Sequence, residues 1–200
     1  MQALLTIARA IDRFTEFVGK SVMWLILVAV LVSAINAIIR KLFNMSSNAW
    51  LELQWYLYGA AFMLAAANTL SRNEHIRIDI FYASRSRKTQ NWIDLFGHLF
   101  FLLPFVALMT WMLVPYMLDA IRTGQISTNA GGLLIWPARA ILLAGFVLLL
   151  LQALAEIVKK IAVIQGLIED PHSFVTAQEA AERESKAIAE ALLTAGKDKA

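Results

Sequence analysis

The chain has 200 residues, of which 59% are apolar and 16% are charged, and its formal net charge is +3. A typical soluble domain has about 25% charged residues, so this composition disfavours a soluble protein. The mean hydropathy of +0.61 points the same way. The sequence contains no cysteine, which excludes disulfides, thiol catalysis and thiolate metal sites.

Residues 1–20 form the first predicted element. Leu4, Ile7, Ile11 and Phe14 recur at helical spacing, with charged residues on the other side. This pattern is typical of an amphipathic helix that lies in a membrane interface. We expect it on the inner surface, before the chain turns into the bilayer.

Four apolar segments follow, each long enough to cross about 30 Å of hydrocarbon, which takes about 20 helical residues. They lie at about residues 21–39, 51–70, 95–118 and 133–157. The first is too long for the apolar part of a cleavable signal peptide, which spans about 7–15 residues. We therefore predict an all-α membrane protein with one four-helix transmembrane domain over residues 21–167.

The basic residues are distributed unevenly around these spans. Three precede the first span, five lie in the second loop and two directly follow the last span, whereas the first and third loops hold two and one. Ten against three predicts, by the positive-inside rule, that both termini and the second loop are cytoplasmic. A multi-pass protein of the bacterial inner membrane fits this pattern.

The second span begins with residues suited to the outer interface. Asn48 is placed to cap the helix, and Glu52 suits the positive end of the helix dipole. Trp50 and Trp55 lie near the interface, where indole side chains are common.

Small residues mark the middle of the same span. Gly59, Ala61 and Ala65 fall within a face of glycine and alanine. Because small side chains let a second helix approach closely, we expect this face to contact a partner.

The stretch NEHIRIDIF begins the second loop and concentrates ionisable side chains. His75 and Asp79 are four positions apart, so on a helix they would share a face. Hydrolytic zinc needs three protein ligands, and no second histidine is near, so a structural role is favoured over a metal or proton-relay site. The isoleucines of this element would face acyl chains, and its basic side, with Arg85, Arg87 and Lys88, would face anionic headgroups. Arg72 and Arg77 are further candidate contacts with lipid or a partner.

The last two spans carry prolines and one internal cation. Pro104 is expected to kink its helix, whereas Pro137 lies at a helix start, where proline is tolerated. Arg139 lies about two turns inside the outer end of the fourth span. Two interpretations stay open for it: snorkelling to the interface, or an ion pair with Glu52 or with an acid of another subunit.

The polar residues 168–200 form a cytoplasmic tail outside the membrane domain. Thr176 followed by Glu179 predicts a capping box that opens a short helix.

Several kinds of chemistry are disfavoured. Only His98 lies in a span, whereas a b-type haem needs two axial ligands, and no GxxxxGK[ST] loop occurs. No carboxylate lies at mid-membrane, which favours an accessory subunit over a carrier acting alone. We expect no enzymatic activity, cofactor, metal or nucleic-acid partner.

Two runs resemble a known family: NAWLELQWYLYGAAFMLAAANTLSRNEHIRIDIF and STNAGGLLIWPARAILLAGFVLLLLQALAEIVKKI. They are similar to the small membrane subunit of tripartite ATP-independent periplasmic (TRAP) transporters, nearest the mannitol/chloroaromatic branch. The similarity covers roughly residues 5–167.

That resemblance implies a supporting role. In this family a periplasmic substrate-binding protein delivers an organic anion, often a carboxylate, to the membrane complex. The large membrane subunit holds the substrate and sodium sites, and the small subunit packs beside its scaffold. The alternative from the residues alone is a membrane anchor for a non-transport complex, such as an oxidoreductase.

Overall fold

The computed structural model describes residues 1–45, 47–74, 82 and 85–170. These residues are helical apart from their connections and one isolated antiparallel bridge, Ile126 to Leu134. The elements are α1 (Gln2–Phe43), α2 (Asn48–Ser71), α4 (Arg87–Gly97), the π-helical η1 (His98–Leu102), α5 (Leu103–Thr123) and α6 (Trp136–Ile164).

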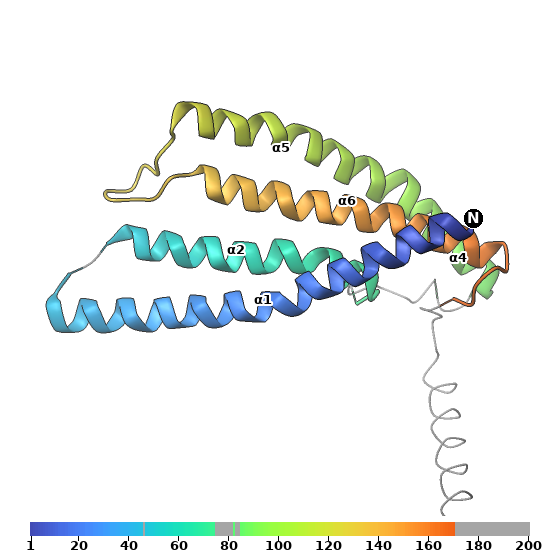
Figure 1. Cartoon of the computed structure of the whole chain (residues 1–200), viewed down its shortest axis with the longest axis horizontal. Helices are drawn as coiled ribbons and strands as arrows, with labels where there is room; N and C mark the ends of the chain where they lie inside the picture. The colour runs from blue at the N-terminus through green and yellow to red at the C-terminus, as the bar shows by residue number, and fades with distance from the viewer. Residues whose placement is uncertain (46, 75–81, 83–84, 171–200) are drawn as a thin grey trace, which may run out of the picture.

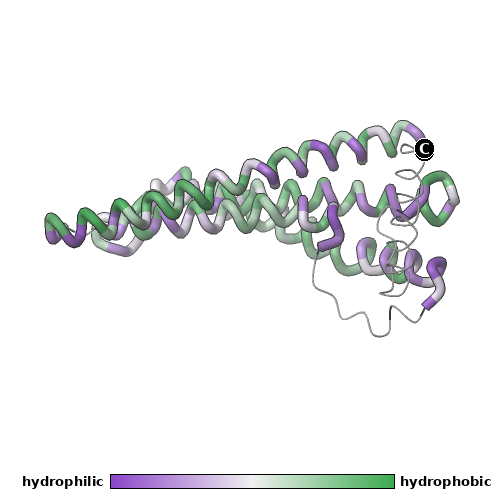
Figure 2. The backbone as a smooth tube through the Cα atoms, turned by 90° about the horizontal axis from the view of Figure 1, so that it is seen from below, coloured by the Kyte–Doolittle hydropathy of each residue, from purple (hydrophilic) through white to green (hydrophobic). Residues whose placement is uncertain are grey.

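The long helices lie side by side in the order α1, α2, α6, α5 (Figure 1). Figure 2 shows them in a narrow layer over much of their length, which opens at the end that holds the N-terminus. We call that end the N-terminal end and the opposite one, with the connections after α1 and α5, the loop end. The described part of the chain is therefore a slab with two broad faces.

Helix α1 is continuous from Gln2 to Phe43. The predicted amphipathic segment 1–20 and the predicted span 21–39 are thus parts of one helix, with no helix break between them. Four buried residues recur every seven positions along it, which keeps one seam of α1 against its neighbours. They are Ala8, Thr15, Val22 and Ala29.

The expected effect of Pro104 takes a specific form. Pro104 is the second residue of α5, and the five residues of η1 directly precede that helix. The amide of Leu103 donates to the carbonyl of His98. Proline removes one amide and crowds the preceding turn, and a π-helical stretch is one way for a helix to absorb this. As a result, α5 runs along α6 while α4 lies across the end of α6 (Figure 1).

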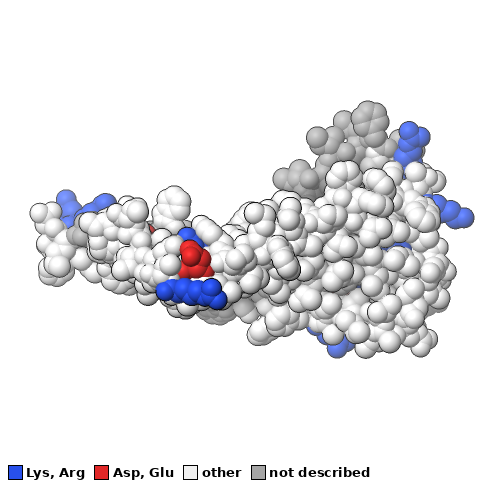
Figure 3. All heavy atoms as spheres, turned by 90° about the horizontal axis from the view of Figure 1, so that it is seen from above, with Lys and Arg blue, Asp and Glu red and all other residues white. Residues whose placement is uncertain are grey.

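Three described helical segments are long and apolar enough to cross a membrane: Gln2–Phe43, Arg87–Thr123 and Trp136–Ile164. Helix α2 is not among them, although its 24 residues extend beside α1 and α6. Figure 3 shows charged side chains near the two ends of this face and one group of acidic and basic side chains partway along it, nearer the loop end, with an uncharged zone between that group and the N-terminal end.

Close approach between helices depends on small residues. A Cβ atom added to Gly145 of α6 would lie 2.7 Å from Cβ of Met63 in α2, and one added to Gly19 of α1 would lie 2.7 Å from Cβ of Asn68. Most of the buried apolar residues are alanine. The large apolar side chains instead cover the two broad faces, as expected where lipid or another membrane subunit is the surrounding medium.

Candidate functional site

The connection between α5 and α6 folds into a hairpin-like loop at the loop end. The amide of Ser127 donates to the carbonyl of Leu133 at 2.9 Å, and that of Ile135 to the carbonyl of Gln125 at 3.0 Å. Gly131 has φ +71°, a left-handed conformation that suits a residue without Cβ.

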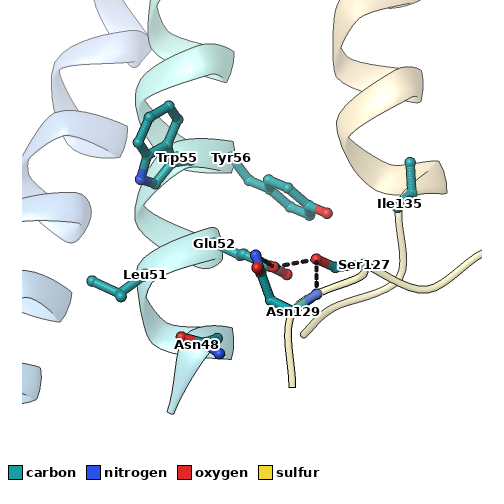
Figure 4. A pocket seen from close by; sticks show the side chains of 8 residues that line it. All are labelled: Asn48, Leu51, Glu52, Trp55, Tyr56, Ser127, Asn129 and Ile135. Atoms are coloured by element: carbon teal, nitrogen blue, oxygen red, sulfur yellow. Dashed lines mark hydrogen bonds between the residues drawn. The ribbon is translucent and has the colours of Figure 1, made fainter. Parts of the chain in front are cut away.

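Glu52 of α2 holds this loop against the bundle. Its Oε1 accepts from the hydroxyl of Ser127 and, at 2.8 Å, from Nδ2 of Asn129 (Figure 4). Its Oε2 accepts from the amide of Leu133 at 2.6 Å. A Cβ atom added to Gly132 would lie 2.9 Å from Oε1 of Glu52. The glycine therefore makes room for the carboxylate.

A cavity of about 570 Å³ opens beside this contact. Tyr56 donates to the carbonyl of Leu134 at 3.0 Å, and Nδ2 of Asn48 donates to the carbonyl of Ala130 at 2.9 Å. The helix cap is Ser47, whose side chain accepts from the amide of Ala49, and not Asn48, which is the first residue of α2. The lining residues are Asn48, Leu51, Glu52, Trp55, Tyr56, Ser127, Asn129 and Ile135.

Arg139 does not pair with Glu52. Its guanidinium donates to the carbonyl of Tyr116 at 2.8 Å and to Oε1 of Gln125 at 2.7 Å, and its Cζ lies 3.6 Å from the centroid of the Tyr116 ring. The nearest acid is Asp119, at 3.9 Å. Arg139 therefore joins the start of α6 to the end of α5, and its side chain is only 12% exposed.

A buried polar network joins three helices at the N-terminal end. Gln152 of α6 accepts from Thr15 of α1 at 2.9 Å and donates to Asp12 of α1 at 2.7 Å and to Glu156 at 2.8 Å. Lys159 bridges the two acids, at 2.9 Å from Asp12 and 2.6 Å from Glu156. Because the partners satisfy one another, the charges can be held inside the protein.

The network reaches α2 through Ser71, whose hydroxyl donates to Asp12 at 3.2 Å. A second ion pair fixes α4 to α6: Nζ of Lys160 lies 3.0 Å from Oδ2 of Asp94, and both side chains are 9% exposed. Asp94 also accepts from Tyr82 at 2.8 Å.

The predicted partner face of α2 is divided between inside and outside. Ala61 is buried within the slab and Ala65 is half-buried. Trp50 is exposed, Trp55 is 77% exposed, and Gly59 is exposed with no heavy atom within 4 Å of an added Cβ. The small-residue packing of Ala61 is therefore made within the chain, and the open side of α2 is aromatic.

The predicted loop residues are only partly placed. Arg72 lies 3.6 Å from Glu16 and 3.9 Å from Glu74. His75, Arg77 and Asp79 lie outside the described residues, so their roles stay predictions. Among the residues that are described, no group of three or more His, Asp or Glu side chains is placed to hold a metal ion.

Sequence analysis missed the network partners. Asp12 and Thr15 are three positions apart, and Gln152, Glu156 and Lys159 follow at spacings of four and three. Each set shares one helix face. A polar stripe on an otherwise apolar helix could have indicated a buried contact, although not which helix supplies the other half.

The helical slab, its apolar faces and its charged ends define a multi-pass membrane protein whose polar side chains hold its own helices together. The chain belongs to the family described as tripartite ATP-independent periplasmic transporters, DctQ component, whose model matches residues 29–163. No similar curated protein and no similar solved structure was found. The family is a transporter component, the small TRAP membrane subunit, and functions in the inner membrane with a large subunit and a substrate-binding protein.

Proposed function

We propose that the chain braces the scaffold of the large TRAP subunit during sodium-coupled, binding-protein-dependent uptake of an organic carboxylate. The observation that carries the proposal is that polar side chains of the helices bind other elements of the same chain. Glu52, Arg139, Gln152 and Lys160 all make contacts between elements of the chain. Fixing the helices at both ends suits a rigid support, while the exposed apolar faces suit contact with lipid and a larger membrane protein.

We further propose that α2 is a fourth span and that both termini are cytoplasmic. Helix α2 lies beside two candidate spans, and 24 residues at about 1.5 Å each exceed the hydrocarbon thickness. By the positive-inside rule, the side of the membrane with more basic residues is cytoplasmic, and ten of the thirteen basic residues that flank the predicted spans belong to the side of the two termini and the second loop.

Reconstitution tests the function. The full chain is purified from native membranes by an affinity tag, its co-purifying proteins are identified, and uptake is measured in vesicles with the large subunit and binding protein, with and without this chain. We expect uptake to require both the chain and a sodium gradient. Equal uptake without the chain would contradict the brace, and co-purification of an oxidoreductase instead would favour the anchor interpretation.

Reporter fusions test the topology. Fusions after Met45 and Ser127 should report the periplasm, and fusions after Ser86 and Gly166 the cytoplasm. If Met45 and Ser86 report the same side, α2 does not cross the membrane.

A further inference from the structure

A second cavity, of about 390 Å³, lies at the N-terminal end between α1, α2 and α6. Three of its seven lining residues are basic and two are acidic. The seven lining residues are Arg9, Asp12, Glu16, Asn68, Ser71, Arg72 and Lys159. None of them belongs to the Glu52 cavity at the loop end.

The level of this cleft relative to the bilayer follows from where the uncharged runs of the three helices end. Helix α1 has no charged residue between Lys20 and Arg40, and α2 has none between Glu52 and Arg72. Helix α6 likewise has none between Arg139 and Glu156. The cleft lies where these three uncharged runs end, which is the level of lipid headgroups in a bilayer.

The acids of the cleft already have cationic partners. Asp12 is 2.9 Å from Lys159, and Glu16 is 2.8 Å from Lys20. Because Lys159 and Lys20 already pair with these acids at short distance, the two arginines are the basic groups of the cleft with the weakest contacts.

Both arginines keep donors for a ligand. Among the described residues, the side-chain hydrogen bond of Arg9 runs from Nε to the carbonyl of Leu5 at 3.3 Å. Arg72 meets Glu16 and Glu74 only at 3.6 and 3.9 Å, beyond good hydrogen-bonding distance. Two guanidinium groups on one cleft, one from α1 and one from the residue that follows α2, are suited to a phosphate.

We propose that this cleft binds the phosphodiester headgroup of an anionic phospholipid, with Arg9 and Arg72 as the phosphate ligands. The unmatched positive charge favours a lipid with a net negative headgroup over a zwitterionic one. The adjoining apolar surfaces would hold the acyl chains, which a free phosphate lacks. The inference concerns the membrane contact of this chain and does not depend on what the complex transports.

Native mass spectrometry of the full chain in mild detergent tests the site, with phosphatidylglycerol and phosphatidylcholine added separately. We expect preferential retention of phosphatidylglycerol. The double variant Arg9→Gln/Arg72→Gln should weaken this retention by roughly tenfold or more. The matched control Arg40→Gln/Lys41→Gln removes two cations from exposed positions at the other end of α1 and should change it by less than about twofold.

Equal loss in the two double variants, or equal retention of both lipids, would overturn the proposal. Displacement of the lipid by inorganic phosphate, but not by chloride, would assign the cleft to a free anion and overturn the lipid assignment. Should the double variant fail to fold, Arg9→Gln alone breaks no ion pair seen among the described residues and should still lower retention severalfold. Because the measurement uses the isolated chain, its outcome is separate from that of the uptake experiment.

Discussion

Gln152 and Asp12 are 140 positions apart in the sequence, yet Nε2 of Gln152 donates to Oδ1 of Asp12 at 2.7 Å. The Gln152 side chain is fully buried, and it also bonds to Thr15 and Glu156. One carboxamide thus ties α1 to α6 and orients two acids around Lys159. This contact is one of several that hold the N-terminal half of α1 to the slab, together with the Lys159 and Ser71 contacts of Asp12.

Gln152→Leu should destabilise the protein. Leucine has a similar size but leaves part of the Asp12 and Glu156 carboxylates without the amide donor, at a cost of about 1–3 kcal/mol. The Thr15 hydroxyl keeps the backbone carbonyls of Ile11 and Asp12 as acceptors. The free energy of unfolding in detergent measures this. Gln165→Leu, at an exposed position after α6, is the control and should change it by less than about 0.5 kcal/mol. Equal effects in both variants would count against the network.

Glu52→Gln should release the loop between α5 and α6. The amide that replaces one carboxylate oxygen would face a donor, either the Leu133 amide or the Ser127 and Asn129 side chains, and lose about 1–3 kcal/mol. We expect faster hydrogen exchange at Leu133 and faster proteolysis within residues 125–135. Glu169→Gln, at an exposed position, should leave both rates unchanged. Unchanged exchange at Leu133 in Glu52→Gln would mean that the carboxylate does not hold the loop.

Two helical glycines should respond oppositely to alanine. Gly145→Ala places a methyl group 2.7 Å from Cβ of Met63 and 3.0 Å from its carbonyl oxygen, so overpacking of about 1–3 kcal/mol should outweigh the gain in helix propensity. Gly59→Ala meets open space and should stabilise the isolated chain by up to about 1 kcal/mol. Thermal unfolding of the two variants checks the prediction. A stabilised Gly145→Ala variant would show that α2 and α6 are not closely packed there.

Arg139→Gln should loosen the contact between α5 and α6. It removes the charged donors to Tyr116 and Gln125 and the cation–π contact with the Tyr116 ring, which together are expected to cost about 1.5–3 kcal/mol. Arg139→Lys should recover only part of this, since an ammonium cannot reproduce the planar fork. Arg122→Gln, on the exposed end of α5, provides the comparison in denaturant titrations. If Arg122→Gln is as costly as Arg139→Gln, net charge and not the contact is responsible.

Local pattern predicted most of the helices. The apolar run at 51–70 falls within α2 (Asn48–Ser71), and the run at 133–157 begins three residues before α6 (Trp136–Ile164) and otherwise lies in it. Pro137 lies in the first turn of α6 as expected. These features depend on hydropathy and backbone chemistry within one segment. The predicted count of four spans stays a prediction, because α2 is not among the described helices that are long and apolar enough to cross a membrane.

The sequence by itself therefore determined the helical class, the membrane setting and the family, since apolar length and residue pattern are readable along the chain. Only the tertiary structure decided the partners of the charged groups. It brought Glu52 into contact with loop residues 75 to 81 positions away and Arg139 into contact with Tyr116 near the end of α5. It also turned Ala61 toward the inside of the slab. The physical reason is that an acid at a helix end or a small residue on a helix face is compatible with several neighbours. Which neighbour it meets is fixed by how the helices are ordered in the slab.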